Sequence, residues 1–201
     1  MITAEEKSSR TRVDTEEKLI AATAELLGEV GPRSLSVRAI AERAGVNHGL
    51  VHHYFGGKDA LLQAAMERLV HSHHDYAMEQ SRQQPIPAPL TLIGDPMYLR
   101  AVVRAVLDNE MSLARTELSE DVSVPRNAMM HVATQQGMDE PTVELKAMMG
   151  LGMAMEMGWA ALEPFIFSVV DADSQNEQEQ IRAVARRFQS QIINEMVMRN
   201  A

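Results

Sequence analysis

The chain has 201 residues, which is enough for one or two domains with a sizeable core, and its formal net charge at pH 7 is -9. It has no cysteine, so disulfide frameworks and thiolate metal sites are excluded. Hydrophobic residues make up 45% of the chain but aromatic residues only 4%, a balance that favours an all-helical protein. Neither a signal peptide nor an apolar stretch of membrane-spanning length is evident, so we expect a cytoplasmic protein without membrane contact.

The amino-terminal residues predict one long helix. Residues 1–13 are polar and should precede the folded part of the chain. Asp14 and Glu17 form a capping-box-like pair, and an apolar stripe follows that stops at Gly31. This first helix should pack on the two shorter helices that come next.

The next residues predict two short helices joined by a tight turn. Ser36 can cap the first of them, whose apolar residues recur at helical spacing until Gly45 stops the pattern. Asn47 can cap the second, which should run from His48 to Tyr54. Two short helices around a glycine-containing turn form a helix-turn-helix, whose second helix can lie in the major groove of DNA.

Helical patterns continue to the end of the chain. A fourth helix should open at Lys58 and run to about Gln83, before prolines at positions 85, 87 and 89 mark a connection. No strand pattern or internal repeat is evident, so the fold class is all-α with about nine helices. The later helices are predicted after Pro96 and at Asn109–Leu118, Pro125–Gln136, Pro141–Phe167 and Glu177–Met198.

The run from Ala44 to Leu61, AGVNHGLVHHYFGGKDAL, resembles the amino-terminal domain of TetR-family transcriptional regulators. Spacing, glycines, aromatic residues and lysine agree with the family pattern over about the first 65 residues. His52 departs from it, because the family usually has a phosphate-contacting tyrosine there, whereas Asn47 replaces a serine and keeps the capping. The resemblance implies a three-helix DNA-binding domain over residues 1–57 and a helical ligand-binding and dimerisation domain over residues 58–201.

Nine residues are predicted to contact DNA. Side chains on the exposed face of the third helix can bind base edges or phosphates, Gly49 permits close backbone approach, and Leu50 can touch a thymine methyl. The phosphate contacts of Ser36, His52 and Lys58 are implied by the resemblance alone. The full set is Ser36, Arg38, Asn47, His48, Gly49, Leu50, His52, His53 and Lys58.

The charges of this segment oppose the acidic charge of the whole chain. Between residues 31 and 58 the basic residues Arg33, Arg38, Arg43 and Lys58 face only one acid, Glu42. Because phosphate affinity depends on the local field of the docking face, a net charge of -9 does not exclude DNA binding.

A methionine- and glycine-rich stretch, residues 148–158, precedes the chain's only tryptophan, Trp159. Methionine adapts to varied ligands and small residues let helices approach closely, so a ligand pocket, dimer packing and ordinary core packing all remain open. We expect Asn109, Met130, Met155 and Trp159 to contact a ligand. Gly152 and Gly158 are six residues apart, so one should face a partner and the other the core of its own protomer.

Other clusters predict little chemistry. His71, His73 and His74 suggest a metal site, because His71 lies three residues from His74 and four from Asp75. Solvated histidines explain the cluster better, so no metal site is expected. No nucleophile elbow, phosphate loop or metalloprotease helix is evident, so we expect no enzyme, no catalytic residues and no cofactor.

Together these features predict a ligand-responsive DNA-binding regulator, most often a repressor in the family that the chain resembles. Its expected partners are double-stranded DNA with a near-palindromic operator, a second copy of the chain in a homodimer, and an apolar or amphipathic small-molecule effector. By the resemblance, the last two long helices should pair with their copies in the dimer. The alternative is a helical ligand- or metal-sensing module that binds no specific DNA.

Overall fold

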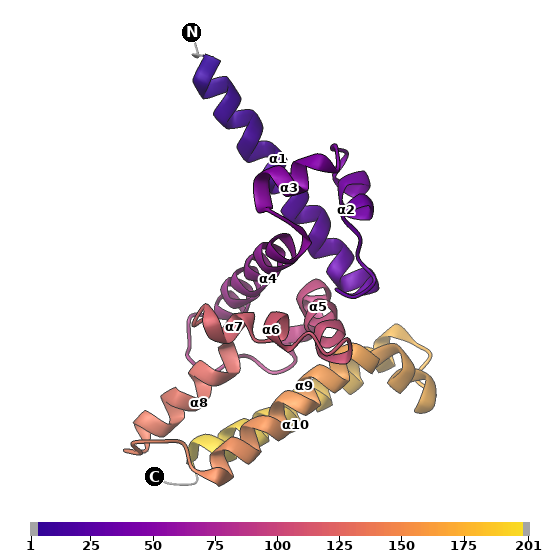
Figure 1. Cartoon of the computed structure of the whole chain (residues 1–201). Coiled ribbons are helices and arrows are strands. Elements are labelled where there is room, and N and C mark those ends of the chain that lie inside the picture. Colours follow the sequence, from indigo (N-terminus) through magenta and orange to yellow (C-terminus); the bar gives the residue numbers. More distant parts are fainter. Residues whose placement is uncertain (1–3, 199–201) are drawn as a thin grey trace. The chain divides into compact units, whose positions relative to one another are not determined.

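The computed structural model describes the backbone of residues 4–198, and over that range it contains ten α-helices, one 3-10 helix and no strand (Figure 1). The predicted all-α fold is confirmed, and the predicted number of helices is one too low. Within these residues, no helix combines the length and the apolar character that crossing a bilayer requires.

The chain divides into two compact units. The first comprises Met1–Ser72 and Arg100–Asp121, and the second comprises His73–Leu99 and Val122–Ala201. Helices α4 (Lys58–Gln80) and α5 (Pro96–Leu107) contribute residues to both units.

The first unit is built around its amino-terminal helices. Helix α1 (Ala4–Val30) is followed by α2 (Val37–Ala44) and α3 (Gly49–Phe55), and the first part of α4 completes the core. The end of α5 and two single-turn helices, α6 (Met111–Ala114) and α7 (Thr116–Ser119), belong to the same unit. Large apolar side chains from the four amino-terminal helices are fully buried in this core, namely Leu19, Leu27, Ile40, Val51, Leu61 and Met66.

Two expectations for this unit were wrong. Helix α1 begins at Ala4 rather than Asp14, because residues 4–13 contain no glycine or proline and include several good helix formers. The helix predicted at Asn109–Leu118 is divided into α6 and α7. Asn109 adopts a left-handed conformation with φ 61°, and Arg115 separates the two short helices with φ -95° and ψ 5°.

The second unit is built on two long helices. Helices α9 (Val143–Val169) and α10 (Gln175–Met198) lie side by side, and α8 (Val124–Gln135) packs against α9 (Figure 1). The three helices share a small apolar core formed by Val132, Ala133, Leu145 and Met196.

The predicted proline-rich connection is confirmed and ends in a 3-10 helix, η1 (Thr91–Gly94), that was not predicted. Four residues are too few to show helical periodicity. The connection is held by the Glu156 carboxylate, which accepts the backbone N–H groups of Leu90 and Leu92 at 2.9 and 2.8 Å. The buried Gln189 side chain also accepts from the Leu90 N–H and donates to Glu156.

Candidate functional site

Helix α2 begins and ends as its sequence predicts. The Ser36 hydroxyl accepts the Ala39 N–H at 3.1 Å, which confirms Ser36 as the capping residue. Gly45 ends the helix with φ 66°, a conformation that favours glycine. Its turn is closed by two backbone bonds, from Gly45 to Glu42 and from Val46 to Ala41.

Helix α3 begins at Gly49, one residue later than predicted. The Asn47 side chain accepts the Gly49 N–H at 2.8 Å, so Asn47 does cap the start of this helix. Val51 is fully buried against the core and fixes which face of α3 points outward.

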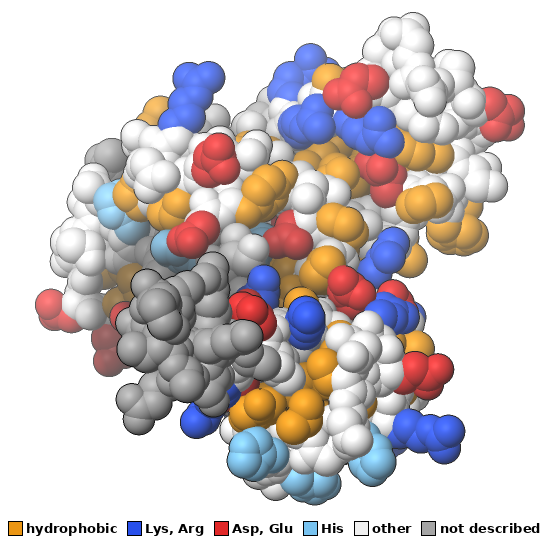
Figure 2. Space-filling view, turned by 90° about the horizontal axis from the view of Figure 1, so that it is seen from above, with side chains coloured by type: hydrophobic (Ala, Val, Ile, Leu, Met, Phe, Trp, Pro, Cys, Tyr) orange, Lys and Arg blue, Asp and Glu red, His pale blue; other side chains and the backbone are white. Residues whose placement is uncertain are grey.

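The predicted DNA-contacting residues lie on the outer surface of this unit. Those of α3 and its cap are exposed, except Leu50, which is half-buried; Ser36 and Arg38 at the start of α2 are exposed too. Lys58, at the first residue of α4, is half-buried. Figure 2 shows histidine side chains gathered at one end of the surface with basic side chains beside them.

Arg43 does not belong to this basic surface, contrary to the sequence-based expectation. Its guanidinium group donates to Glu25 at 3.0 Å and to Glu29 at 2.8 Å, both on α1. The hydrogen bond from Arg43 lowers the pKa of Glu29 below its usual value. Arg43 therefore joins α2 to α1. The basic residues of this segment that remain available to contact DNA phosphates are Arg33, Arg38 and Lys58.

The turn between α1 and α2 is held by two residues that sequence analysis did not select. Arg104 of α5 donates to the Gly28 carbonyl at 3.0 Å, and Asp108 accepts the Arg33 backbone N–H at 3.1 Å. Gly31 lies in this turn with φ 80°. No sequence signal could have found these contacts, because the partners are about 75 residues apart along the chain.

The residues predicted to contact a ligand are dispersed. Met155 and Trp159 lie one turn apart on α9, and Met130 is exposed on α8 in the same unit. Asn109 is exposed in the turn after α5 and belongs to the other unit.

The histidines considered as metal ligands have other neighbours. His71 lies 3.1 Å from Glu120, and His74 lies 3.4 Å from Asp75. His73 is buried, bonds to Asp95 at 3.0 Å and stacks on the Tyr98 ring at 3.9 Å. Among the described residues, no group of three or more potential ligands is arranged to hold a metal ion.

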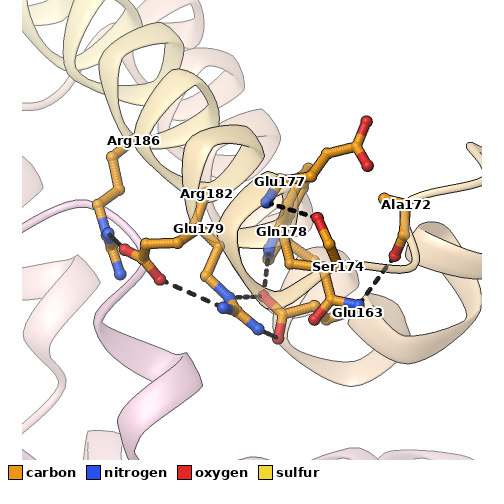
Figure 3. Close-up of polar contacts among 9 residues, drawn as sticks. Glu163, Ala172, Ser174, Glu177, Gln178, Glu179, Arg182 and Arg186 are labelled. Atoms are coloured by element: carbon orange, nitrogen blue, oxygen red, sulfur yellow. Dashed lines mark hydrogen bonds and ion pairs between the residues drawn. The ribbon is translucent and has the colours of Figure 1, made fainter.

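Trp159 belongs to a polar network that joins α9 to α10, in which its indole N–H donates to Glu163 at 3.0 Å. Arg182 donates to both carboxylate oxygens of Glu163 at 2.9 Å (Figure 3). Arg182 and Arg186 also donate to Glu179. The hydrogen bond from Arg182, assisted by that from Trp159, lowers the pKa of Glu163.

This network should make the stability of the α9–α10 pair depend on pH. Because the folded-state pKa of Glu163 is lowered, its contribution is present above the usual carboxyl pKa and is lost as the pH falls through the folded value. We expect Glu163→Gln to lower the free energy of unfolding at pH 7 by about 1–3 kcal/mol and to flatten its decline in acid. Urea unfolding followed by Trp159 emission at several pH values measures both effects.

Glu177→Gln is the matched control, because Glu177 is exposed near the start of α10, the helix that carries Arg182. Its effect should stay within about 0.5 kcal/mol at every pH. Acid profiles that coincide for the wild type and Glu163→Gln would show that the ion pair contributes nothing.

Helix α9 carries an exposed apolar stripe with alternating spacings of four and three residues. We call its members the α9 stripe: Leu151, Met155, Gly158, Leu162, Phe165 and Val169, all exposed except the half-buried Gly158. Leu151 is 70% exposed, Leu162 53% and Phe165 66%. Helix α10 adds the exposed residues Val184 and Phe188.

The glycines of α9 are not packed within their own protomer. A Cβ atom added at Gly150, Gly152 or Gly158 would meet no other side chain or distant backbone within 4 Å. The expectation that Gly152 or Gly158 packs against the protomer core was therefore wrong.

Comparisons with known proteins agree on the helix-turn-helix. Residues 19–65 match the sequence model of the family described as bacterial regulatory proteins, tetR family. The HTH-type transcriptional regulator BetI 1 of Chromohalobacter salexigens is 34% identical over 105 residues, covering 52% of this chain and 46% of that protein. BetI of Yersinia pestis is 42% identical over 93 residues, covering 46% of this chain and 44% of that protein. The matches thus span less than half the length of these relatives.

Solved structures extend the likeness of fold to nearly the whole chain. A TetR-family transcriptional regulator from Rhodococcus sp. has a TM-score of 0.61 at 19% identity, covering 91% of this chain and 98% of that chain. A mutant HlyIIR protein has a TM-score of 0.59 at 15% identity, covering 93% of this chain and 99% of that chain. Residues 19–65 of this chain are thus similar in sequence to the tetR family of bacterial regulatory proteins, and the fold of nearly the whole chain is similar to that of these solved structures.

Proposed function

We propose that this protein is a cytoplasmic, ligand-responsive DNA-binding regulator, and more specifically a repressor that a small molecule releases from its operator. The observation that carries the proposal is the exposed face of α3, held by the Asn47 cap and by buried Val51 in the domain that matches the family. The curated relatives that match this domain are named as HTH-type transcriptional regulators.

In this proposal, residues 1–57 read DNA. His48, Leu50 and His53 face base edges, and Gly49 permits close approach of the backbone. Ser36 and His52 contact phosphates, while Arg38 reaches a base or a phosphate. Lys58 adds a charge to the amino-terminal end of α4, where free N–H groups and the helix dipole already favour an anion.

Residues 58–201 bind the effector and form the dimer in this proposal. The α9 stripe and the exposed apolar residues of α10 pair with their copies in a homodimer, because exposed apolar surface of this extent on long helices favours a protein partner. A two-fold dimer fixes the separation of its two α3 helices. The operator is then near-palindromic, with half-sites about 34–36 Å apart or at a multiple of that distance.

Alanine substitutions test the assignment of DNA contacts. Lys58→Ala should weaken binding to all sequences and reduce the salt dependence by about one counterion, since a phosphate contact releases counterions. Arg38→Ala and His48→Ala should instead relax preference at particular base positions, by roughly 1–3 kcal/mol each. Titration of operator variants at several salt concentrations separates the two outcomes.

Lys146→Ala removes an equal charge from an exposed position on α9 and should change neither property. An equal loss for Lys58→Ala, Arg38→Ala and His48→Ala, with no positional signature, would remove the base-reading assignment.

We also propose that the effector is apolar or amphipathic and that, within the second unit, Met130 and Trp159 are candidate contacts. Trp159 is the only tryptophan, so its emission reports on its surroundings alone. A ligand bound beside it should change that emission over the concentration range in which DNA is released, because one binding equilibrium governs both signals. A ligand that releases DNA fully but leaves the emission unchanged would place the pocket elsewhere.

A further inference from the structure

A hollow of about 260 Å³ lies within the second unit. Its wall is formed by the end of α4, by the loop that follows and by the start of α8, through His74, Met78, Gln83, Pro85, Val124 and Asn127. We propose that this hollow binds a small amphipathic molecule with an uncharged, hydrogen-bonding head group. A role as the effector site rests on the proposed function and would replace the contacts proposed beside Trp159, whereas binding itself rests on neither.

The chemistry of the wall selects this class of ligand. Met78, Pro85 and the buried Val124 offer an apolar surface. The side-chain amides of Gln83 and Asn127 form no hydrogen bond with any residue that the structure describes, so their donors and acceptors are available. No wall residue is Asp, Glu, Lys or Arg, and the ring of His74 in the wall already lies 3.4 Å from the carboxylate of Asp75. A charged head group would therefore lose hydration without gaining an unpaired opposite charge.

The loop at the rim is built in a strained conformation. Arg82 and Gln83 are consecutive non-glycine residues in the left-handed region, with φ 54° and 62°. Backbone bonds from Gln83 to Met78 at 2.8 Å and from Arg82 to Glu79 at 3.0 Å hold them there. Left-handed non-glycine residues persist only where the surroundings fix them, and they concentrate at ligand-binding positions. Here the strain places an amide side chain at the rim of the hollow.

The size of the hollow limits the ligand. It is smaller than the clefts of about 300–1,000 Å³ that take drug-sized molecules. A single small ring with one polar substituent suits the dimensions. Benzamide is a suitable probe, and benzoate and benzylammonium provide probes of similar size that carry a charge.

Methionine-methyl NMR on the full chain tests binding directly. The Met78 resonance, assigned with Met78→Leu, should shift saturably with benzamide at a Kd of about 1 mM, as expected for a fragment. Benzoate and benzylammonium should bind about tenfold more weakly. No shift of Met78, or equal shifts for the three probes, would overturn the proposal.

Asn127→Trp fills the hollow from an exposed position and should abolish the Met78 shift. Arg126→Trp is the matched control, because Arg126 is the exposed neighbour on α8 and is not part of the wall. It should preserve the shift. A shift that survives in Asn127→Trp places the probe elsewhere and overturns the site.

The effector role is tested by linkage. Saturating benzamide should weaken operator binding about threefold or more, and operator DNA should weaken benzamide binding by the same factor. A Met78 shift that leaves operator binding unchanged overturns the effector role but keeps the binding site. Failure of the untreated protein to bind any operator specifically is instead a failure of the proposed function.

Discussion

Replacing Leu162 with arginine should separate the proposed dimer and abolish operator binding while leaving each protomer folded. Leu162 is 53% exposed in the α9 stripe, so the new side chain meets water in the single protomer. In a two-fold dimer it would be buried twice, near its own copy and without an opposite charge. Central interface substitutions cost about 2–4 kcal/mol each, so two copies should raise the dimer dissociation constant by roughly 10³-fold or more.

Sedimentation measures the dissociation, circular dichroism checks the fold, and fluorescence anisotropy with labelled operator DNA measures the loss of binding. Leu107→Arg is the matched control, because Leu107 is 79% exposed at the end of α5, outside α9 and α10. It should leave dimerisation unchanged. A Leu162→Arg protein that remains a dimer at micromolar concentration would show that the α9 stripe is not the interface.

The helix-turn-helix could be predicted from the sequence because its signals are local. Ser36 and Asn47 cap helices through side chains that reach only two or three residues along the chain. Gly45 ends α2 because it adopts a left-handed backbone conformation, which favours glycine. These contacts need no tertiary information, so spacing and residue type were sufficient.

Contacts between distant segments could not be predicted in this way. Arg43 lies in the basic segment that was expected to face DNA, but its side chain pairs with Glu25 and Glu29. Nothing near Asp108 in the sequence indicates that it accepts the Arg33 N–H. Both contacts depend on how helices pack, and hydrophobic periodicity leaves the partner of a polar side chain undetermined.

The long helix α9 shows a further limit of sequence patterns. Its apolar residues occupy more than one face, so periodicity alone cannot tell core from interface. The structure separates buried from exposed apolar positions, because Leu145 and Phe167 are buried whereas Leu151 and Phe165 are largely exposed. The same distinction shows that Gly158 is open rather than packed within the protomer.

Replacing Gly31 with alanine should destabilise the first unit and weaken operator binding. Gly31 has φ 80°, where an L-residue costs about 1–2 kcal/mol, and the added Cβ would lie 2.8 Å from Asp108 Oδ2 and 3.3 Å from Arg104 Cβ. Overpacking of this kind typically costs a further 1–3 kcal/mol or so. We therefore expect the free energy of unfolding to fall by about 2–5 kcal/mol in total.

Gly56→Ala separates the two contributions. Gly56 lies in the same unit with φ 75°, and a Cβ added there meets nothing within 4 Å. It should show the backbone cost alone, about 1–2 kcal/mol in urea unfolding. Equal losses of unfolding free energy for Gly31→Ala and Gly56→Ala would mean that the Asp108 side chain moves away from the added Cβ at no cost.

Asp108→Ala completes the test. If the clash with Asp108 is real, Gly31→Ala should destabilise less in an Asp108→Ala background than in the wild type, because the carboxylate is already gone. Operator affinity should follow the same order, since the turn that carries Gly31 leads directly into the Ser36 cap of α2. A Gly31→Ala protein could instead show reduced stability but unchanged operator affinity. In that case the contacts of Arg104 and Asp108 with this region stabilise the fold but do not set the position of the DNA-reading helices.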